Sequence, residues 1–518
     1  MIGQQEGPIS PPAPAGTPAL LTTLARWAAQ LDLAQVPPRV VDLATSQVLA
    51  QLAAIRAGLA HSRAAALVNA FGTPWQADPR QSAAVLATLG CWLNLDDTAY
   101  AGHLAPSTVA VPLAYAEADG LSGAALLTSV IAANECAARI TAAATLGPLR
   151  GQSALHTHLG GAVAGRLASR RAPAREWVDA LGLAFAAPPW PVMHAFLSGD
   201  AKLLHVLPSI RTAMDACDAA AAGIRGAADV LEHPRGFLER FAAVPLPETV
   251  VDGLGSRWHT ETLSFKLRPG GPGIDAAVDC AVGLHREIGE ATITSVLVDA
   301  SIYTIYAGRQ AERYLAGPDS PISALLLSTA YPVATALLTG DLTVADFDTP
   351  AVREPARWDL AARVRLRHDP AMTRRLFASV APFGAALQQA GERATPWLRQ
   401  VFGDTELATL ASLAADPSDA YGPRPATMGS GPDSGEFRHA DKATPARVTV
   451  DLADGRTLSR EQVIPLGAAG AHTRGHHREL VRAKFLAQGG RADVADALSD
   501  LPDLPPERLA RTLRLALA

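Results

Sequence analysis

The chain has 518 residues, of which 48% are hydrophobic and only 5% aromatic, and its formal net charge is −5. This length allows more than one compact domain with a large core. The abundance of alanine favours closely packed helices over a β-rich structure. The slightly acidic balance gives no electrostatic reason to expect a nucleic-acid partner or a membrane surface, and no apolar run reaches the roughly 20 residues that span a bilayer.

The N-terminal residues and the cysteines bear on the cellular compartment and on metal binding. Residues 1–18 are polar and proline-rich, without the basic and apolar regions of a secretory signal, which predicts a disordered tail and a cytoplasmic protein. No CxxC or Cys/His spacing indicates a zinc or iron–sulfur site, so no metal is expected. The four scattered cysteines are expected to be reduced and buried: Cys91, Cys136, Cys217 and Cys280.

From Leu20 to about Leu263 the pattern is helical throughout. Apolar residues at helical spacing predict helices over Val40–Leu59, Gln81–Leu95 and Gly123–Ile140. In the last of these, Glu135 and Arg139 are four residues apart, the spacing of an exposed ion pair. Small residues over 160–167 would let helices approach closely.

One connection between two predicted helices, Leu93–Thr108, concentrates polar side chains. Asp96 and Asp97 follow the C-terminus of a helix, where carboxylates are disfavoured. Pro106 then opens another helix, ending near Gly120, whose N–H groups could hold an anion. The arrangement is that of a binding site or, alternatively, of a capped and solvated loop.

A second polar group lies further along the helical region. Lys202 and His205 are three residues apart and so share one helical face. Two basic side chains in apolar sequence suit a pocket for carboxylates, although the pattern on its own favours simple exposure.

Beyond Leu263 the sequence is of mixed α/β type. β-branched runs predict strands, and longer patterns predict helices. The turn Ala453–Arg456 between two such runs indicates a hairpin, while the Gly/Pro/Ser-rich stretch Pro417–Lys442 is expected to be a mobile loop. The expected strands are Ala291–Ile305, Asp359–His368 and Ala446–Leu452, and the expected helices are Asp275–Ile288, Ser323–Leu338, Arg374–Leu413 and His476–Phe485.

Five motifs in order along the chain resemble those of the MmgE/PrpD family, which includes 2-methylcitrate dehydratase, cis-aconitate decarboxylase and iminodisuccinate epimerase. They are Asn94-Leu-Asp-Asp-Thr98 followed by His103, the histidine-containing Ser153–Gly161, Ala201-Lys-Leu-Leu-His205, Lys266, and Ser328–Leu337 with Tyr331. The sequence departs from the family pattern in four respects. Asn94 replaces an acid, one residue is missing between Thr98 and His103, the His156/His158 region is shortened, and an insertion occupies about 375–443.

The resemblance implies a mainly α fold in two domains. A large all-helical domain would comprise 19–265 completed by 472–518, and a smaller α/β lid would comprise 266–471. The active site would lie between them in a homodimer. The implied chemistry is cofactor-free proton abstraction next to a carboxylate, followed by loss of water or CO₂ or by reprotonation.

Site roles follow from the same motifs. His103 is the expected proton-transfer group, because such chemistry needs a base that titrates near working pH. Lys202, His205 and Lys266 would form a cationic pocket for substrate carboxylates. Thr98 and Asp97 would orient substrate or His103, and Tyr331 could deliver a proton from the lid. Asp96 is expected to bond to backbone. Asn94 and one or both of His156 and His158 would contact substrate.

Three functions remain open from the sequence. The first is a lyase, either a dehydratase or a decarboxylase, acting on a small di- or tricarboxylic acid. The second is an isomerase or epimerase on the same scaffold, to which Asn94 gives weight, because loss of an acid changes proton delivery. The third is a non-catalytic binding homologue.

Overall fold

The computed structural model describes residues 18–99, 102–144, 155–271, 273–381, 385–405, 407–408 and 437–518. Nearly all of the predicted tail, and most of the predicted loop Pro417–Lys442, lie outside these ranges. The last residues of the predicted loop, 437–442, lie within the described ranges. Phe437–His439 form a short 3-10 helix (η11), and Lys442 is buried, so this end of the predicted loop is ordered.

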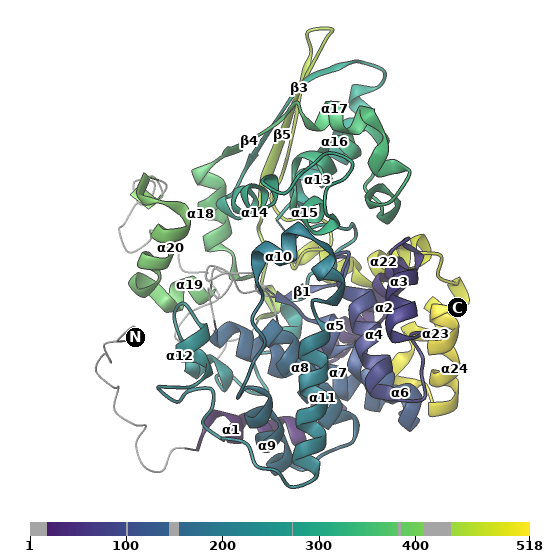
Figure 1. Ribbon diagram of the computed structural model, residues 1–518, viewed down its shortest axis with the longest axis vertical. Coiled ribbons are helices and arrows are strands. Elements are labelled where there is room, and N and C mark those ends of the chain that lie inside the picture. Colours follow the sequence, from purple (N-terminus) through teal and green to yellow (C-terminus); the bar gives the residue numbers. More distant parts are fainter. Residues whose placement is uncertain are drawn as a thin grey trace.

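The first body is built from helices (Figure 1). Its N-terminal part holds α1 (Leu20–Ala29), α2 (Pro38–Ala60), α3 (Ala64–Phe71), α4 (Pro79–Cys91), α5 (Ala105–Thr108), α6 (Ala110–Asp119), α7 (Gly123–Ala143), α8 (Leu155–Ser169), α9 (Ala174–Ala184), α10 (Met193–Ser198), α11 (Leu207–Ala221) and α12 (Phe237–Phe241). The C-terminal helices α22 (Ala471–Ala487), α23 (Ala492–Ser499) and α24 (Pro506–Leu517) lie against α2 and α6. The two ends of the chain therefore build one helical body.

The helix ends follow from local sequence. Pro38 opens α2, where its missing N–H costs nothing. The side chain of Asp78 caps α4 by accepting the N–H of Arg80. Gly120 ends α6 in the left-handed conformation, as predicted. The predicted helices over 40–59, 81–95 and 123–140 are confirmed as α2, α4 and α7, with small shifts at their ends.

The second body surrounds a four-stranded sheet, shown at the top of Figure 1. The strand order is β4-β3-β5-β6, with β3 and β4 parallel and the other pairs antiparallel. The strands are β3 (Ile293–Ala300), β4 (Val364–His368), β5 (Ala446–Leu452) and β6 (Thr457–Gln462). The helices are α13 (Asp275–Ile288), α14 (Ile302–Glu312), α15 (Ile322–Leu327), α16 (Ala330–Thr339), α17 (Pro355–Ala361), α18 (Pro370–Ala378), α19 (Ala385–Ala390) and α20 (Thr395–Phe402).

Several predictions for this body hold and others shift. The hairpin around Ala453–Arg456 is confirmed as the β5–β6 connection. The predicted strand Ala291–Ile305 ends at Ala300, because Ser301 precedes helix α14. The predicted strand Asp359–His368 begins as helix α17. The predicted helix Ser323–Leu338 is interrupted at Ser328 and forms α15 and α16. The pattern is therefore mainly α, with a smaller α/β part.

Two large buried clusters form the core. The first contains side chains of α1 to α9, of α11 and α12, and of the C-terminal helices. The second contains side chains of the sheet and its helices, together with Trp92, Leu93 and Leu95 from the end of α4. The chain directly after α4 therefore passes from one core into the other, and the polar connection 93–108 starts at this boundary.

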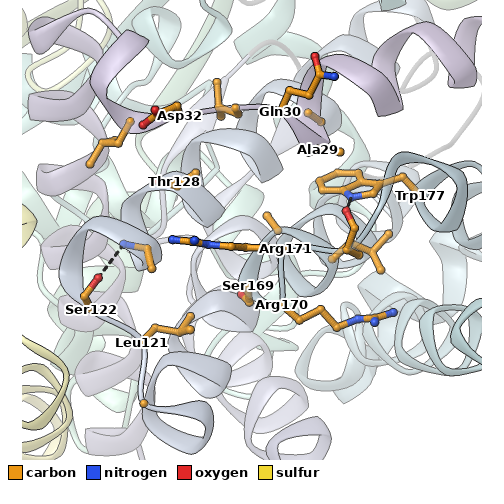
Figure 2. A pocket seen from close by; sticks show the side chains of 18 of the residues that line it. Ala29, Gln30, Asp32, Leu121, Ser122, Thr128, Ser169, Arg170, Arg171 and Trp177 are labelled. Carbon is orange, nitrogen blue, oxygen red and sulfur yellow. Dashed lines mark hydrogen bonds between the residues drawn. The ribbon is translucent and has the colours of Figure 1, made fainter.

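Two cavities are described away from that connection. One, of about 690 Å³, lies among α1, α7, α8 and α9 and is lined by Arg171, Trp177 and neighbours (Figure 2). The other, of about 580 Å³, is lined by residues of both bodies, including His61 and Asp348. Neither is lined by a predicted site residue. None of the helices in the described ranges combines the length and apolarity needed to cross a bilayer.

Candidate active site

The polar connection after α4 folds into a buried hairpin. Asn94 adopts a left-handed conformation with φ of 50°, which Asn and Asp tolerate better than other non-glycine residues. The chain then forms β1 (Thr98–Ala99) and β2 (Gly102–His103), in which Thr98 pairs with His103. Asp96, Asp97 and Thr98 are all buried. The interpretation as a solvated loop is therefore wrong.

His103 is held by a carboxylate at one ring nitrogen. Its Nδ1 lies 2.7 Å from Oδ2 of Asp96, which is fully buried, while the imidazole is 18% exposed. This bond fixes the ring orientation through Nδ1, and Nε2 is the ring nitrogen that Asp96 does not engage. The expectation that Asp96 bonds to backbone is wrong, because its carboxylate orients His103 instead.

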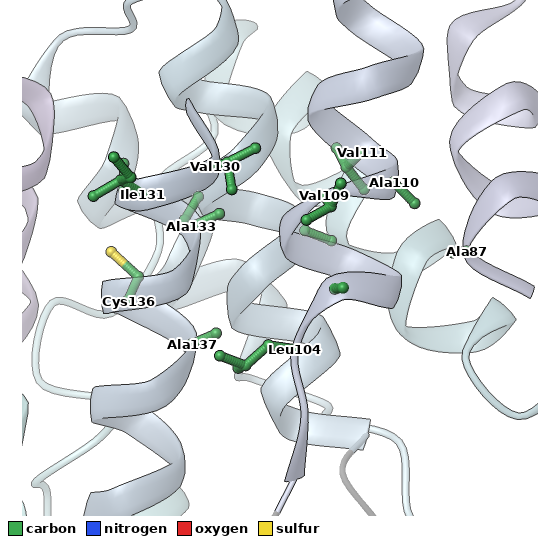
Figure 3. Close-up of a cluster of buried hydrophobic side chains, with 14 of the residues drawn as sticks. Ala87, Leu104, Val109, Ala110, Val111, Val130, Ile131, Ala133, Cys136 and Ala137 are labelled. Carbon is green, nitrogen blue, oxygen red and sulfur yellow. The ribbon is translucent and has the colours of Figure 1, made fainter. Parts of the chain in front are cut away.

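Asp97 does what was expected of Asp96. Its Oδ1 accepts the N–H groups of Leu104 at 3.3 Å and Ala105 at 2.9 Å, at the start of α5. Burial raises the pKa of Asp97 to about 6, and the Ala105 N–H opposes that rise. The predicted anion site at this helix end is thus occupied by the protein's own carboxylate. Leu104, which precedes α5, is buried beside Ala137 of α7 (Figure 3).

Two of the other predicted histidines, His158 and His205, lie close enough to His103 for their charges to interact, and the structure separates His156 from His158. His158 on α8 has Nδ1 3.2 Å from Ser107 Oγ, and Gly161 permits this approach because a Cβ there would meet Ser107 at 2.6 Å. Burial holds the pKa of His158 well below its usual range, and the nearby charges of His103, His205 and Lys202 lower it further. His156, on a different side of α8, packs beside Phe237.

The His205 ring is partly buried and stacks edge-on against Phe196, with the ring centres 4.8 Å apart. Burial holds its pKa well below the usual range, and Lys202 and His103 lower it further. A neutral imidazole donates or accepts hydrogen bonds rather than supplying charge. This direction argues against the expectation that His205 is a cation, whereas its proximity to His103 agrees with a place in the site.

The two predicted lysines come from different segments of the chain and contact different groups. Lys202 comes from a 3-10 turn over Asp200–Leu204, and its Nζ lies 3.4 Å from the carbonyl of Cys91 at the end of α4. Lys266 follows Ser264, which bridges to Thr98, and its Nζ donates to Asp275 at 2.5 Å. Both side chains are buried.

Comparison with known protein families identifies two matching domain models. The MmgE/PrpD N-terminal domain matches residues 22–248, and the MmgE/PrpD C-terminal domain matches residues 271–390. The chain belongs to the MmgE/PrpD family. Members of this family are typically enzymes of the dehydratase and lyase type. No curated protein matches the chain in sequence.

The hairpin of this MmgE/PrpD protein is contacted by two further lysines that the motifs did not identify. Lys442 donates from Nζ to Oγ1 of Thr98 at 2.9 Å, and Lys484 on α22 donates from Nζ to the carbonyl of Leu95 at 2.5 Å. Burial lowers the pKa of Lys442 to about 8 and that of Lys484 to about 7. Asp96 and Asp97 oppose the shift of Lys484.

Tyr331 has a different environment. It is buried in the second core cluster beside Trp358, and its hydroxyl donates to the carbonyl of Asp346 at 2.6 Å. None of the contacts found for it in the described ranges reaches the hairpin. A hydroxyl whose proton is held by a carbonyl is poorly placed to deliver that proton, so Tyr331 is a packing residue and the predicted proton delivery is not supported.

No group of three or more His, Cys, Asp or Glu side chains in the described ranges is placed to hold a metal ion. Metal and cofactor independence stays a prediction. Apart from Asp96, which bonds His103, and Asp97, which bonds the start of α5, the charged and titratable side chains near the hairpin are lysines and imidazoles, which suit anionic ligands.

Proposed function

We propose that this protein is a lyase that acts on a small di- or tricarboxylic acid without a cofactor, by proton abstraction next to a carboxylate. The observation that carries the proposal is the Asp96–His103 pair at a hairpin surrounded by buried lysines. A base oriented by a carboxylate accepts a proton from carbon. Ammonium groups stabilise both the substrate carboxylates and the charge that develops on them as the proton leaves.

The buried cations support a polycarboxylate as substrate. In the described ranges neither Lys202 nor Lys442 forms an ion pair with an acidic side chain, and both are at least 96% buried. Isolated buried charge is costly, so such groups need an anionic partner. Substrate carboxylates would supply it. A homodimer, usual in the family, is part of this proposal.

The structure weakens the argument for the isomerase alternative. Asn94 gave that alternative weight as the replacement for an acid. It occupies a left-handed position that ends the segment after α4, where Asn and Asp are both favoured for conformational reasons. Both an acid and an amide suit this backbone conformation, so the presence of Asn94 is not by itself a reason to expect a different reaction.

The test is His103→Ala, assayed on a panel of di- and tricarboxylic acids with NMR identification of the products. We expect kcat to fall roughly 10²- to 10⁴-fold, because the variant lacks the proton-transfer group, while the melting temperature stays within a few degrees. His476→Ala, at an exposed position of α22, is the control. Parental turnover by His103→Ala would contradict the role of His103 and make His158 the better candidate. Formation of an epimer without loss of water or CO₂ would favour the isomerase.

A further inference from the structure

The chain uses lysine sparingly and in one place. Lysine and arginine together number 45, and only four of these are lysine. All four are buried, with 3–4% of their surface exposed: Lys202, Lys266, Lys442 and Lys484. Each contacts the hairpin or a segment that holds it. The exposed basic positions are therefore arginine.

This division has a chemical reason. Arginine keeps its charge in proteins, whereas the pKa of a buried lysine moves towards neutral pH, so lysine can exchange a proton. A chain that covers its surface with arginine and retains lysine only around one hairpin points to ammonium groups that arginine cannot replace. Lys266 is paired with Asp275, and Lys484 faces Asp96 and Asp97. Lys442 is the one whose contact is a site hydroxyl.

The position of Lys442 is rigid. Its backbone N–H donates to the carbonyl of Ala469 at 2.9 Å, and the next residue, Ala443, donates to Ser379 Oγ at 2.8 Å. Its Nζ donates to Thr98 Oγ1 at 2.9 Å. Thr98 is the register partner of His103. Opposed residues of an antiparallel pair project to the same face with Cβ atoms about 4.5–5.5 Å apart, so the Thr98 side chain that holds Lys442 lies on the same face of the hairpin as His103.

The charged groups near Lys442 favour proton exchange. Burial lowers its pKa to about 8, Asp275 opposes the shift and Lys266 adds to it. Asp275 is itself bonded to Lys266, so it offers little to a second ammonium group. At neutral pH Lys442 carries a proton that it can release and recover.

We propose that Lys442 is the second proton-transfer group of this site, protonating the oxygen that leaves the substrate while His103 removes the proton from carbon. The proposal rests on the proposed function. The C–H electron pair forms the C=C bond, the C–O bond breaks, and the departing oxygen takes the Nζ proton to become water. His103 then holds one proton more and Lys442 one fewer, and exchange with solvent restores both. Thr98 positions the ammonium group.

The first experiment compares Lys442→Arg with Lys442→Met. Arginine preserves the charge but does not release its proton, so Lys442→Arg should keep KM near the parental value while kcat falls roughly 100-fold or more. Lys442→Met removes both the charge and the proton donor, so KM should rise and kcat should fall. The alkaline limb of the kcat profile, expected near pH 8 in the parent, should disappear in Lys442→Arg. Arg175→Lys, whose side chain is 72% exposed on α9, is the control and should match the parent.

The second experiment needs no turnover. In protein labelled with ¹³C at lysine Cε, four side-chain resonances are expected, assigned through the lysine variants, and Arg175→Lys adds an exposed reference. The Lys442 resonance should titrate near pH 8 and shift when citrate is added as a tricarboxylate probe.

The outcomes separate the two proposals. Titration of Lys442 at the value of the exposed reference, or parental kcat in Lys442→Arg, would overturn the role of Lys442 while leaving the lyase proposal intact. Failure of the parent to convert any polycarboxylate would overturn the proposed function, and with it the transfer step. The titration would still show whether Lys442 exchanges a proton near neutral pH.

Discussion

Two groups of buried charges in this protein differ in how completely the fold satisfies them. The first, the Glu135 cluster, is made by Glu135 and Arg139 on α7, which the sequence predicted to be an exposed pair and which are in fact fully buried. Glu135 accepts two backbone N–H groups, of His259 and Thr260, and the Thr260 hydroxyl. Arg139 donates to three carbonyls in 252–257. This cluster ties a long loop to α7.

The second group, the site cluster, consists of the buried charges around the hairpin. Asp96 bonds His103 through one oxygen, and its other oxygen has no hydrogen-bond partner in the described ranges. Lys202 and Lys442 each contact a single neutral oxygen. Buried polar groups in folded proteins are almost always satisfied. The comparison suggests that the Glu135 cluster serves the fold, whereas the site cluster is completed by a ligand.

The largest expected effect tests the first half of this comparison. Glu135→Leu leaves the Arg139 charge buried without its carboxylate, which typically costs about 3–5 kcal/mol. The free energy of unfolding, measured with urea, should fall by this amount. Activity per folded molecule should change little, since Glu135 bonds the fold and not the hairpin. An unchanged stability would mean that the cluster is not what holds the 252–260 loop.

Replacement of a site lysine should impair activity and leave stability unchanged or higher, the reverse of what is expected for Glu135→Leu. Lys202→Met removes a charge-assisted contact to substrate worth about 1.5–3 kcal/mol, so KM should rise about 10- to 100-fold. Unfolding free energy should stay the same or increase, because an unpaired buried ammonium is removed. Steady-state kinetics and urea unfolding on the same sample give both values. A loss of stability with unchanged KM would show that Lys202 stabilises the fold and does not bind substrate.

The helices and most of the candidate site residues could be predicted from the sequence, because both are marked by local patterns of residues. Apolar spacing located α2, α4 and α7, and the motif located His103 and Lys202. The exchange of roles between Asp96 and Asp97 could not be predicted, because it depends on the hairpin register that turns one carboxylate to the imidazole and the other to α5.

Long-range contacts account for the other errors. Lys442 and Thr98 are 344 positions apart, and Lys484 and Leu95 are 389 apart. No motif spacing covers such distances. The scarcity of lysine was a visible signal, since it marks the positions where arginine does not suffice. Tyr331 shows the converse, because its motif is present while its hydroxyl bonds to Asp346 within the second body.

Asp97 has features of both clusters, and its replacement should have the smallest effect. Its carboxylate bonds the backbone at the start of α5, as a structural group does, yet it is the neighbour of Asp96 in the site cluster. Burial raises its pKa from 3.8 to about 6. Between these values the folded protein binds more protons than the unfolded chain, so the contribution of Asp97 to stability is present at low pH and is lost as pH rises through 6.

Asp97→Asn isolates this contribution. The amide oxygen still accepts the Leu104 and Ala105 N–H groups, but it never ionises. The stability of the variant relative to the parent should therefore increase as pH rises from about 4 to 6 and then level off. Urea unfolding of both proteins across this range measures it, with Asp78→Asn at the exposed cap of α4 as the matched control. A difference independent of pH would show that Asp97 ionises as readily in the folded protein as in the unfolded chain. Its carboxylate would then be satisfied by α5 as fully as Glu135 is by its loop, which would place Asp97 with the structural charges.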